Sequence, residues 1–486
     1  MDRSKASQLF RYWFTFASPV SPRQYLQHGA ALMASKYASD VLIVQLGADR
    51  WWMPLDYMSS ISTLQRTTLA ESPFWLMPLL ALWTLPFLWA GITLTVRRAI
   101  DAGQSPWCAL LFFIPYLNYV VIALFCVLPS SVEGAFAEQP PRARDAQPQY
   151  LMAMLPGLVL GLAMIGLSVY TLKSYGVALF FATPFGIGAI SAWSLNRRAA
   201  ATQWQTTQLV MLTLGLLAAL LVGLGREGAV CIAMAVPLAI VLGLMGSVLG
   251  RQIANETHEF QGSLRSAGIG LLALPVAALL EPRTGTGVIL HEVRSSVEIA
   301  AAPMTVWSQV VAFPPMPEPT SWFFRMGVAY PKYARIEGSG VGAVRYCVFS
   351  TGPFVEPITV WEPGRRVAFD VRSAPVPLIE LTPYDSIAPP HLHGFLESRR
   401  GEFRLIALPN GNTRLEGSTW YTIRIGPEGY WQVFGDYLIH QIHLRVLEHI
   451  KVQTEAHVAA HPAATVDHFL AEGVHTATPT RESAVP

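Results

Sequence analysis

Four histidines near the C-terminus have the residue type and spacing of metal ligands. His391 and His393 form a His-x-His pair in a proline-flanked loop, and His440 and His443 are three residues apart, near Asp436. Imidazole nitrogens and carboxylate oxygens are common zinc ligands. Nothing in the sequence places the loop beside the second pair, and no further framework fixes a ligand count. We therefore expect no metal and no cofactor, and interpret these histidines as polar positions of a helix and a structured loop.

A second candidate for chemistry is a pair of opposite charges inside an apolar stretch, Lys36 and Asp40. Ionisable residues inside a membrane are costly and often functional. A spacing of four places both on one helix face, where they can neutralise each other. We favour a structural ion pair that faces the bundle interior over a functional site. No other mid-membrane charges suggest a proton relay or an ion path, so a transporter lacks its usual evidence.

The composition explains why such charges stand out. Of 486 residues, 52% are hydrophobic and 14% are charged, against about 25% charged in soluble domains. The mean hydropathy is +0.36. The 34 lysines and arginines balance 32 acidic residues, which leaves no basic field for nucleic acid. A wholly soluble protein, a disordered chain and a charge-driven nucleic-acid binder are therefore excluded.

The apolar residues are concentrated before residue 282. A membrane-spanning helix needs about 20 mostly apolar residues. Eight segments meet this expectation: Gln27–Leu46, Phe74–Val96, Trp107–Leu128, Leu151–Leu172, Val177–Leu195, Gln208–Leu224, Ala229–Leu249 and Ala267–Leu280. They predict a three-helix membrane region over residues 25–130 and a five-helix region over 151–282, joined by a polar linker over 131–150.

The sidedness follows from the basic residues and the even number of spans. Lysine and arginine counts on the two sides are equal, so the whole-chain comparison decides nothing. The leading flank of the first helix is the more basic flank. We therefore expect the N-terminal residues 1–24 to be cytoplasmic, and eight spans return the C-terminal domain to the same side.

The segment after the second predicted span carries a more specific pattern, Arg97-Arg98 followed by Asp101, Gly103 and Trp107. It resembles the signature of a bacterial inner-membrane family, domain of unknown function 805, over about Pro22–Ser130. The resemblance implies architecture and a bacterial inner-membrane location, and the family has no established chemistry. We expect the arginines at the headgroup level paired with Asp101, a turn at Gly103, and Trp107 as an interface anchor.

Residues 288–457 read as a separate soluble domain. A strand at His291–Ile299 is followed by two short helices, six strand-like runs and a long amphipathic helix near Gly429–Ala456. Together with Ala302–Trp307, Gly340–Ala343 and Thr413–Gly417, this order resembles the superfamily of START lipid-transfer domains, polyketide cyclases and the birch pollen allergen. The resemblance implies an α+β helix-grip fold, a curved antiparallel sheet around the helix with a cavity for an apolar ligand. Residues 458–486 are expected to be disordered.

The cavity candidates follow from this expectation. We expect a volume of a few hundred Å³. The predicted lining residues lie on the long helix and on two strands: Val433, Tyr437, His440, His443, Val446, Arg404 and Tyr421.

No nucleophile elbow, phosphate loop or convergent acid–base group is evident, which favours binding over catalysis. We predict that the domain binds a hydrophobic small molecule or lipid near the bilayer. The alternatives are a cyclase- or hydrolase-like enzyme acting on such a ligand, and a transporter with a ligand-sensing domain. The partners predicted are the lipid bilayer and this ligand. Protein partners cannot be identified from the sequence.

Overall fold

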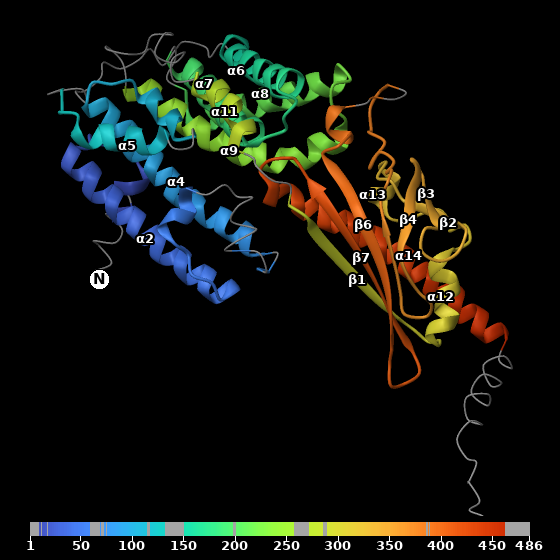
Figure 1. Cartoon of the computed structure of the whole chain (residues 1–486). Coiled ribbons are helices and arrows are strands. Elements are labelled where there is room, and N and C mark those ends of the chain that lie inside the picture. The colour runs from blue at the N-terminus through green and yellow to red at the C-terminus, as the bar shows by residue number, and fades with distance from the viewer. Residues whose placement is uncertain are drawn as a thin grey trace, which may run out of the picture. The chain divides into compact units, whose positions relative to one another are not determined.

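The chain forms two compact units in the computed structural model (Figure 1). The helical unit contains residues 1–289, 380–395 and 423–433, and the α+β unit contains residues 290–379, 396–422 and those from 434 on. The structure describes residues 9–10, 12–16, 18–58, 69, 72–73, 75–113, 117–131, 150–197, 201–256, 272–284, 289–384, 387 and 389–461. Most of the predicted linker and the predicted disordered tail beyond residue 461 lie outside the described residues.

Four helices in the described part of the helical unit are long and apolar enough to cross a membrane. The helix α6 (Tyr150–Ile165) continues into the π-helical η3 (Gly166–Thr171), and η4 (Ala178–Ala182) continues into α7 (Thr183–Asn196). The other two are α8 (Gln203–Gly223) and α9 (Ala229–Glu256). They coincide with the fourth to seventh predicted spans.

The remaining predicted spans are also helical where they are described. The first lies inside α2 (Pro22–Ala48), and most of the second lies inside α4 (Leu76–Asp101). The eighth ends inside α11 (Ala273–Thr284), which has 12 residues. For these segments a membrane-spanning role stays a prediction. A short helix, η1 (Pro54–Met58), follows α2.

The third predicted span differs from the structure because it is not one described helix. The structure has η2 (Pro106–Phe113) and α5 (Leu117–Val127) in its place. Pro115 lies between them, outside the described residues. Whether this segment crosses the membrane stays a prediction.

The centre of the helical unit is α7. In the continuous helix that η4 and α7 form, 89% of the most apolar 18-residue stretch is buried. Its backbone lies against α9, because glycines replace side chains at the contact. A Cβ on Gly188 would lie 2.0 Å from the Gly243 carbonyl oxygen, and a Cβ on Gly246 would lie 2.0 Å from that of Phe185. Small residues permit this close packing of helices where the surrounding lipid is as apolar as the side chains.

The α+β unit is built on a seven-stranded antiparallel sheet in the order β1-β7-β6-β5-β4-β3-β2. The strands are β1 (His291–Ile299), β2 (Pro331–Glu337), β3 (Val344–Phe349), β4 (Gly352–Glu362), β5 (Arg366–Asp370), β6 (Leu396–Ala407) and β7 (Thr413–Ile423). Two short helices, α12 (Pro303–Val311) and α13 (Trp322–Arg325), separate β1 from β2. The short η5 (Pro390–Leu392) precedes β6, and α14 (Glu428–Ala460) follows β7.

The long helix α14 lies along one face of the sheet (Figure 1). Its Val446, Leu447 and Ile450 are buried in one core with Ile299 of β1 and Leu415 of β7. The alternation of apolar and polar residues in β1 places every second side chain on this core, as a half-buried strand requires. The predicted fold class, a helical membrane region followed by an α+β helix-grip domain, is therefore confirmed.

Candidate functional site

A cavity of about 110 Å³ lies between the sheet and α14 in the α+β unit. Four phenylalanines and four aliphatic side chains form most of its apolar lining: Phe349, Phe354, Phe369, Phe403, Val371, Ile439, Ile442 and Val446. This volume is below the few hundred Å³ expected of a pocket for a drug-sized ligand. An apolar cavity of about 150 Å³ can hold benzene, so this cavity matches a compact apolar group.

A buried ion pair forms part of the polar lining. Arg345 of β3 donates a hydrogen bond to the carboxylate of Glu356 on β4, and both side chains are almost fully buried. The two residues are directly opposite each other in the antiparallel register. The Arg345 guanidinium also lies 5.4 Å from the ring centre of Phe369 and 5.5 Å from that of Phe403. Burial raises the pKa of Glu356, and the positive charge of Arg345 opposes that shift.

His443 of α14 is the second polar feature of the cavity wall. Its Nε2 atom lies 2.7 Å from the Thr419 hydroxyl, and its Nδ1 atom lies 3.2 Å from the Ser295 hydroxyl. His440 contacts the same Ser295 hydroxyl at 2.7 Å through its own Nδ1. Burial, followed by the effect of His440, lowers the pKa of His443 to about 4. His443 is therefore neutral at physiological pH and can serve as a hydrogen-bonding group.

The structure brings only part of the predicted set to this cavity. His443 and Val446 line it. His440 does not line it but contacts the Ser295 hydroxyl, which His443 also contacts. Val433 and Tyr437, by contrast, are 53% and 50% exposed.

The two strand candidates also lie elsewhere. Arg404 forms an ion pair with Glu402 and its side chain is 47% exposed. Tyr421 is fully buried and donates a hydrogen bond of 2.6 Å to Asp436, so it fastens β7 to α14. Whether any of the predicted residues binds a ligand stays a prediction.

Sequence reasoning missed Arg345 and Glu356. Both strands have apolar residues on each face, so periodicity does not say which side of the sheet the charges occupy. The signal that could have found them is charge complementarity between β3 and β4. In the β3–β4 register Arg345 lies directly opposite Glu356, and opposite charges in such a cross-strand pair stabilise each other.

The histidines weighed as metal ligands do not form a single group. His440 and His443 belong to the α+β unit, whereas His391 belongs to the helical unit, and His393 is exposed.

Lys36 and Asp40 form an ion pair in α2, with side chains 14% and 1% exposed. Tyr57 of η1 donates a hydrogen bond of 2.5 Å to the same Asp40 oxygen. The Lys36 ammonium also lies 5.7 Å from the Tyr57 ring centre and 5.9 Å from that of Phe87. The pair thus has two aromatic side chains beside it, and its structural role stays a prediction.

The Arg97–Trp107 segment is more buried than expected. Arg98 forms an ion pair of 2.7 Å with Asp101, and Gly103 has a φ of 67°, as the predicted turn requires. Arg97, however, donates to the carbonyls of Tyr12 and Ser18.

Arg97, Arg98 and Trp107 are at most 1% exposed, and their expected positions at headgroup depth stay a prediction. Trp107 packs edge-on against Trp193 of α7, with ring centres 5.9 Å apart. The guanidinium groups satisfy internal backbone carbonyls, so this segment ties the first helices together.

Residues 29–135 match a family described as "Protein of unknown function (DUF805)". The match covers most of the segment on which the sequence resemblance rests, so that resemblance is confirmed. No curated protein matches the chain.

Solved structures similar to the chain align with about a third of it. A protein from Nitrosospira multiformis is 17% identical, with a TM-score of 0.23, over 34% of this chain and 96% of that one. Norcoclaurine synthase from Thalictrum flavum is 11% identical, with a TM-score of 0.24, over 35% and 98%. The ZhuI aromatase/cyclase from Streptomyces sp. R1128 is 13% identical, with a TM-score of 0.23, over 35% and 96%.

Proposed function

We propose that the α+β unit binds a small hydrophobic molecule, or the compact apolar end of a larger amphipathic one, in the cavity between the sheet and α14. The observation that carries the proposal is the cavity itself, a partly open space of about 110 Å³ lined largely by aromatic and aliphatic side chains. Well-packed interiors contain few voids larger than a water molecule, so a space of this size between a sheet and its helix can accept a small apolar group.

The polar groups around the cavity can orient a ligand. Ligand pockets are generally apolar with a few placed polar groups. Arg345, Glu356 and His443 provide such groups here, and each is held by a partner within the unit. A bound molecule with one polar substituent would exchange a hydrogen bond with this set while its apolar part fills the space.

The test is a cavity-filling substitution in the full chain, purified in mild detergent. Val446→Trp places an indole in the cavity, because Val446 lines it from α14. Small molecules extracted from the purified protein are identified by mass spectrometry. We expect a species that is present at about one per chain in the wild type and is reduced at least tenfold in Val446→Trp.

The matched control is Val452→Trp, which introduces the same side chain at a position of α14 that is 59% exposed. It should retain the ligand at the wild-type level. Equal ligand loss in both variants, or no co-purifying species in the wild type and no stabilisation by small aromatic compounds, would contradict the proposal.

A second candidate, an acid–base enzyme acting on the bound molecule, is favoured by one observation. Glu356 and His443 line the same cavity, with a raised pKa for the carboxyl and a pKa of about 4 for the imidazole. Residues with perturbed pKa values that line a cavity are typical of functional sites. If the extracted species is a substrate–product pair, His443→Gln should change their ratio, whereas a binding protein gives one species.

In this proposal the chain is an integral protein of a bacterial inner membrane, and the α+β unit is on the cytoplasmic side close to the bilayer. The support is the DUF805 match, the four apolar helices and the basic leading flank of the first helix. A hydrophobic ligand partitions into lipid, so a binding unit tethered to the membrane meets it at high local concentration.

A further inference from the structure

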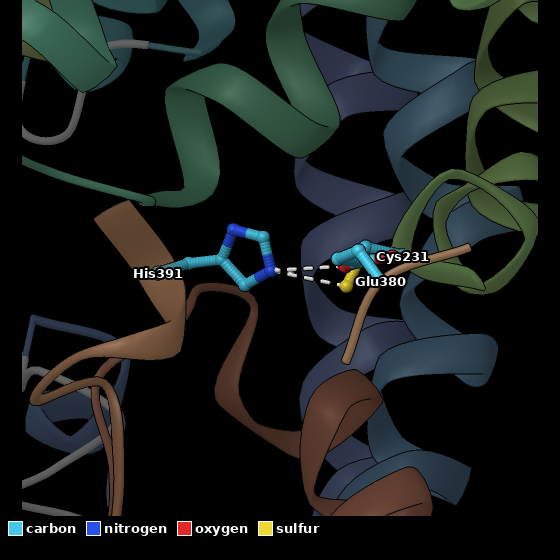
Figure 2. A group of neighbouring side chains, drawn as sticks. All are labelled: Cys231, Glu380 and His391. Carbon is cyan, nitrogen blue, oxygen red and sulfur yellow. Dashed lines mark hydrogen bonds and ion pairs between the residues drawn. The ribbon is translucent and has the colours of Figure 1, made fainter. Parts of the chain in front are cut away.

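Within the helical unit, three side chains that are distant in sequence converge at the start of α9 (Figure 2). The imidazole of His391 points toward the Cys231 sulfur and the Glu380 carboxylate, and the donor atoms of all three lie within 4.8 Å of one another. We propose that Cys231, Glu380 and His391 bind a divalent transition-metal ion, for which zinc fits the donor set best.

The spacing of the donor atoms is close to that of a tetrahedral zinc site. The Cys231 Sγ atom lies 3.0 Å from His391 Nε2, and this Nε2 atom lies 3.8 Å from a Glu380 carboxylate oxygen. Zinc bound at about 2.3 Å from sulfur and about 2.1 Å from nitrogen or oxygen requires separations of roughly 3.4–3.6 Å. Changes of about half an ångström, within the reach of side-chain rotation, bring the donors to these values.

The surroundings of the buried Glu380 carboxylate favour a bound cation. Its side chain is fully buried, and neither carboxylate oxygen has a hydrogen-bond partner in the part of the chain that the structure describes. The cost of burying a carboxylate is offset only by hydrogen bonds or by a charge of opposite sign. Gly228 leaves room for this carboxylate, because a Cβ there would lie 1.8 Å from one of its oxygens.

A carboxylate lies behind the imidazole ring of His391. The Nδ1 atom of His391 lies 3.3 Å from a Glu227 oxygen, while Nε2 faces the other two donors. Tyr175 in turn donates a hydrogen bond of 3.1 Å to Glu227, and its ring meets His391 edge-on at 5.3 Å. Metal-bound histidines commonly have such a carboxylate behind the ring, which fixes the tautomer.

The backbone keeps the three segments in place. The Ala229 amide donates to the Leu381 carbonyl, which joins the start of α9 to the segment that carries Glu380. Pro389 and Pro390 restrict the backbone immediately before His391. A thiol, an imidazole and a carboxylate together suit zinc, whereas magnesium and calcium prefer oxygen donors alone. Three protein ligands leave a fourth position for a water or a further ligand.

The full chain, purified in detergent through an affinity tag that contains no histidine, provides the test. After incubation with zinc and removal of free metal, elemental analysis should find about one zinc per chain. After loading with cobalt(II) instead, the thiolate should give a charge-transfer band in the near ultraviolet. Cys231→Ser should abolish this band and lower the zinc content at least tenfold.

Two further variants separate ligands from supporting residues. Cys126→Ser changes a free cysteine of α5 and should leave both readouts at the wild-type level. Glu227→Gln should weaken zinc binding about 10–100-fold while the cobalt–thiolate band persists at saturation. A wild-type chain with no more zinc than Cys231→Ser, or cobalt bound without a thiolate band, would overturn the proposal. Either result would leave a metal-free cluster in which protonated His391 pairs with the two carboxylates.

Discussion

Several of the buried charged side chains lie beside a partner of opposite charge. Lys36 and Asp40 are four residues apart in α2, Arg98 and Asp101 are three apart in α4, and Arg345 and Glu356 face each other across β3 and β4. Removing a single partner from such a pair leaves an uncompensated buried charge, which costs more than removing both. The residues of each pair should therefore be energetically coupled.

The first prediction applies this coupling to α2. Lys36→Met and Asp40→Leu should each lower the midpoint of thermal unfolding in detergent, and the double variant should lose less than the sum of the two. Tyr57→Phe removes the second hydrogen bond to Asp40 and should have a smaller effect. Additive losses would mean that the two side chains do not stabilise each other, and would favour a functional role for one of them.

The second prediction concerns pH and His443. Its pKa is about 4 in the folded chain and about 6.5 in an unfolded one, so below pH 6.5 the unfolded chain takes up a proton that the folded chain does not. The free energy of unfolding of the α+β unit should fall as the pH drops from 6.5 to 4, by about 3 kcal/mol for this group.

Amide hydrogen exchange of β1 and β7, compared with His443→Gln at each pH, measures this contribution. The variant should lose part of the protection at neutral pH but show a weaker dependence on pH. Parallel pH profiles for the two proteins would show that His443 does not set the acid sensitivity.

At the scale of elements, the helical unit depends on the contact between α7 and α9. Glycines at 188, 243, 246 and 250 bring these helices so close that a Cβ on Gly188, Gly246 or Gly250 would meet a backbone carbonyl of the other helix at about 2 Å. A backbone atom cannot move aside as a flexible side chain can. The packing is therefore intolerant of even small additions.

The third prediction is that Gly246→Val lowers the free energy of unfolding by about 3 kcal/mol or more, because the helices must separate. The matched control is Gly215→Val in α8, where a Cβ meets nothing within 4 Å. Thermal unfolding followed by size-exclusion chromatography compares the two. Equal midpoints for both variants would contradict the close contact of α7 and α9.

At the scale of the whole molecule, the functional proposal depends on which side of the membrane the α+β unit occupies. The basic leading flank of the first helix and the even number of predicted spans predict that both termini are in the cytoplasm. The fourth prediction is that reporter fusions at Met1 and at Pro486 both give cytoplasmic signals. An external signal from the C-terminal fusion alone would mean an odd number of spans, with the segment that contains Pro275 as the first to re-examine.

Much of the architecture was predictable because it depends on local patterns. β1 begins and ends at the predicted residues, since the alternation of apolar and polar residues is a property of a short segment. Four spans follow from the length and apolarity of continuous runs. The pairing of Lys36 with Asp40 follows from helical spacing alone. In each case the interacting residues are neighbours in the sequence.

Only the tertiary structure decided the chemistry, because its groups are distant in sequence. Arg345 and Glu356 meet through strand register, and His443 reaches the cavity while Val433 and Tyr437 of the same helix are exposed. His391 was noticed for its neighbour His393, but its partners in space are Cys231, 160 residues earlier, and Glu380. Composition and periodicity report only on residues that are close in the sequence. A binding site forms where the fold brings distant segments together, so these patterns could not predict it.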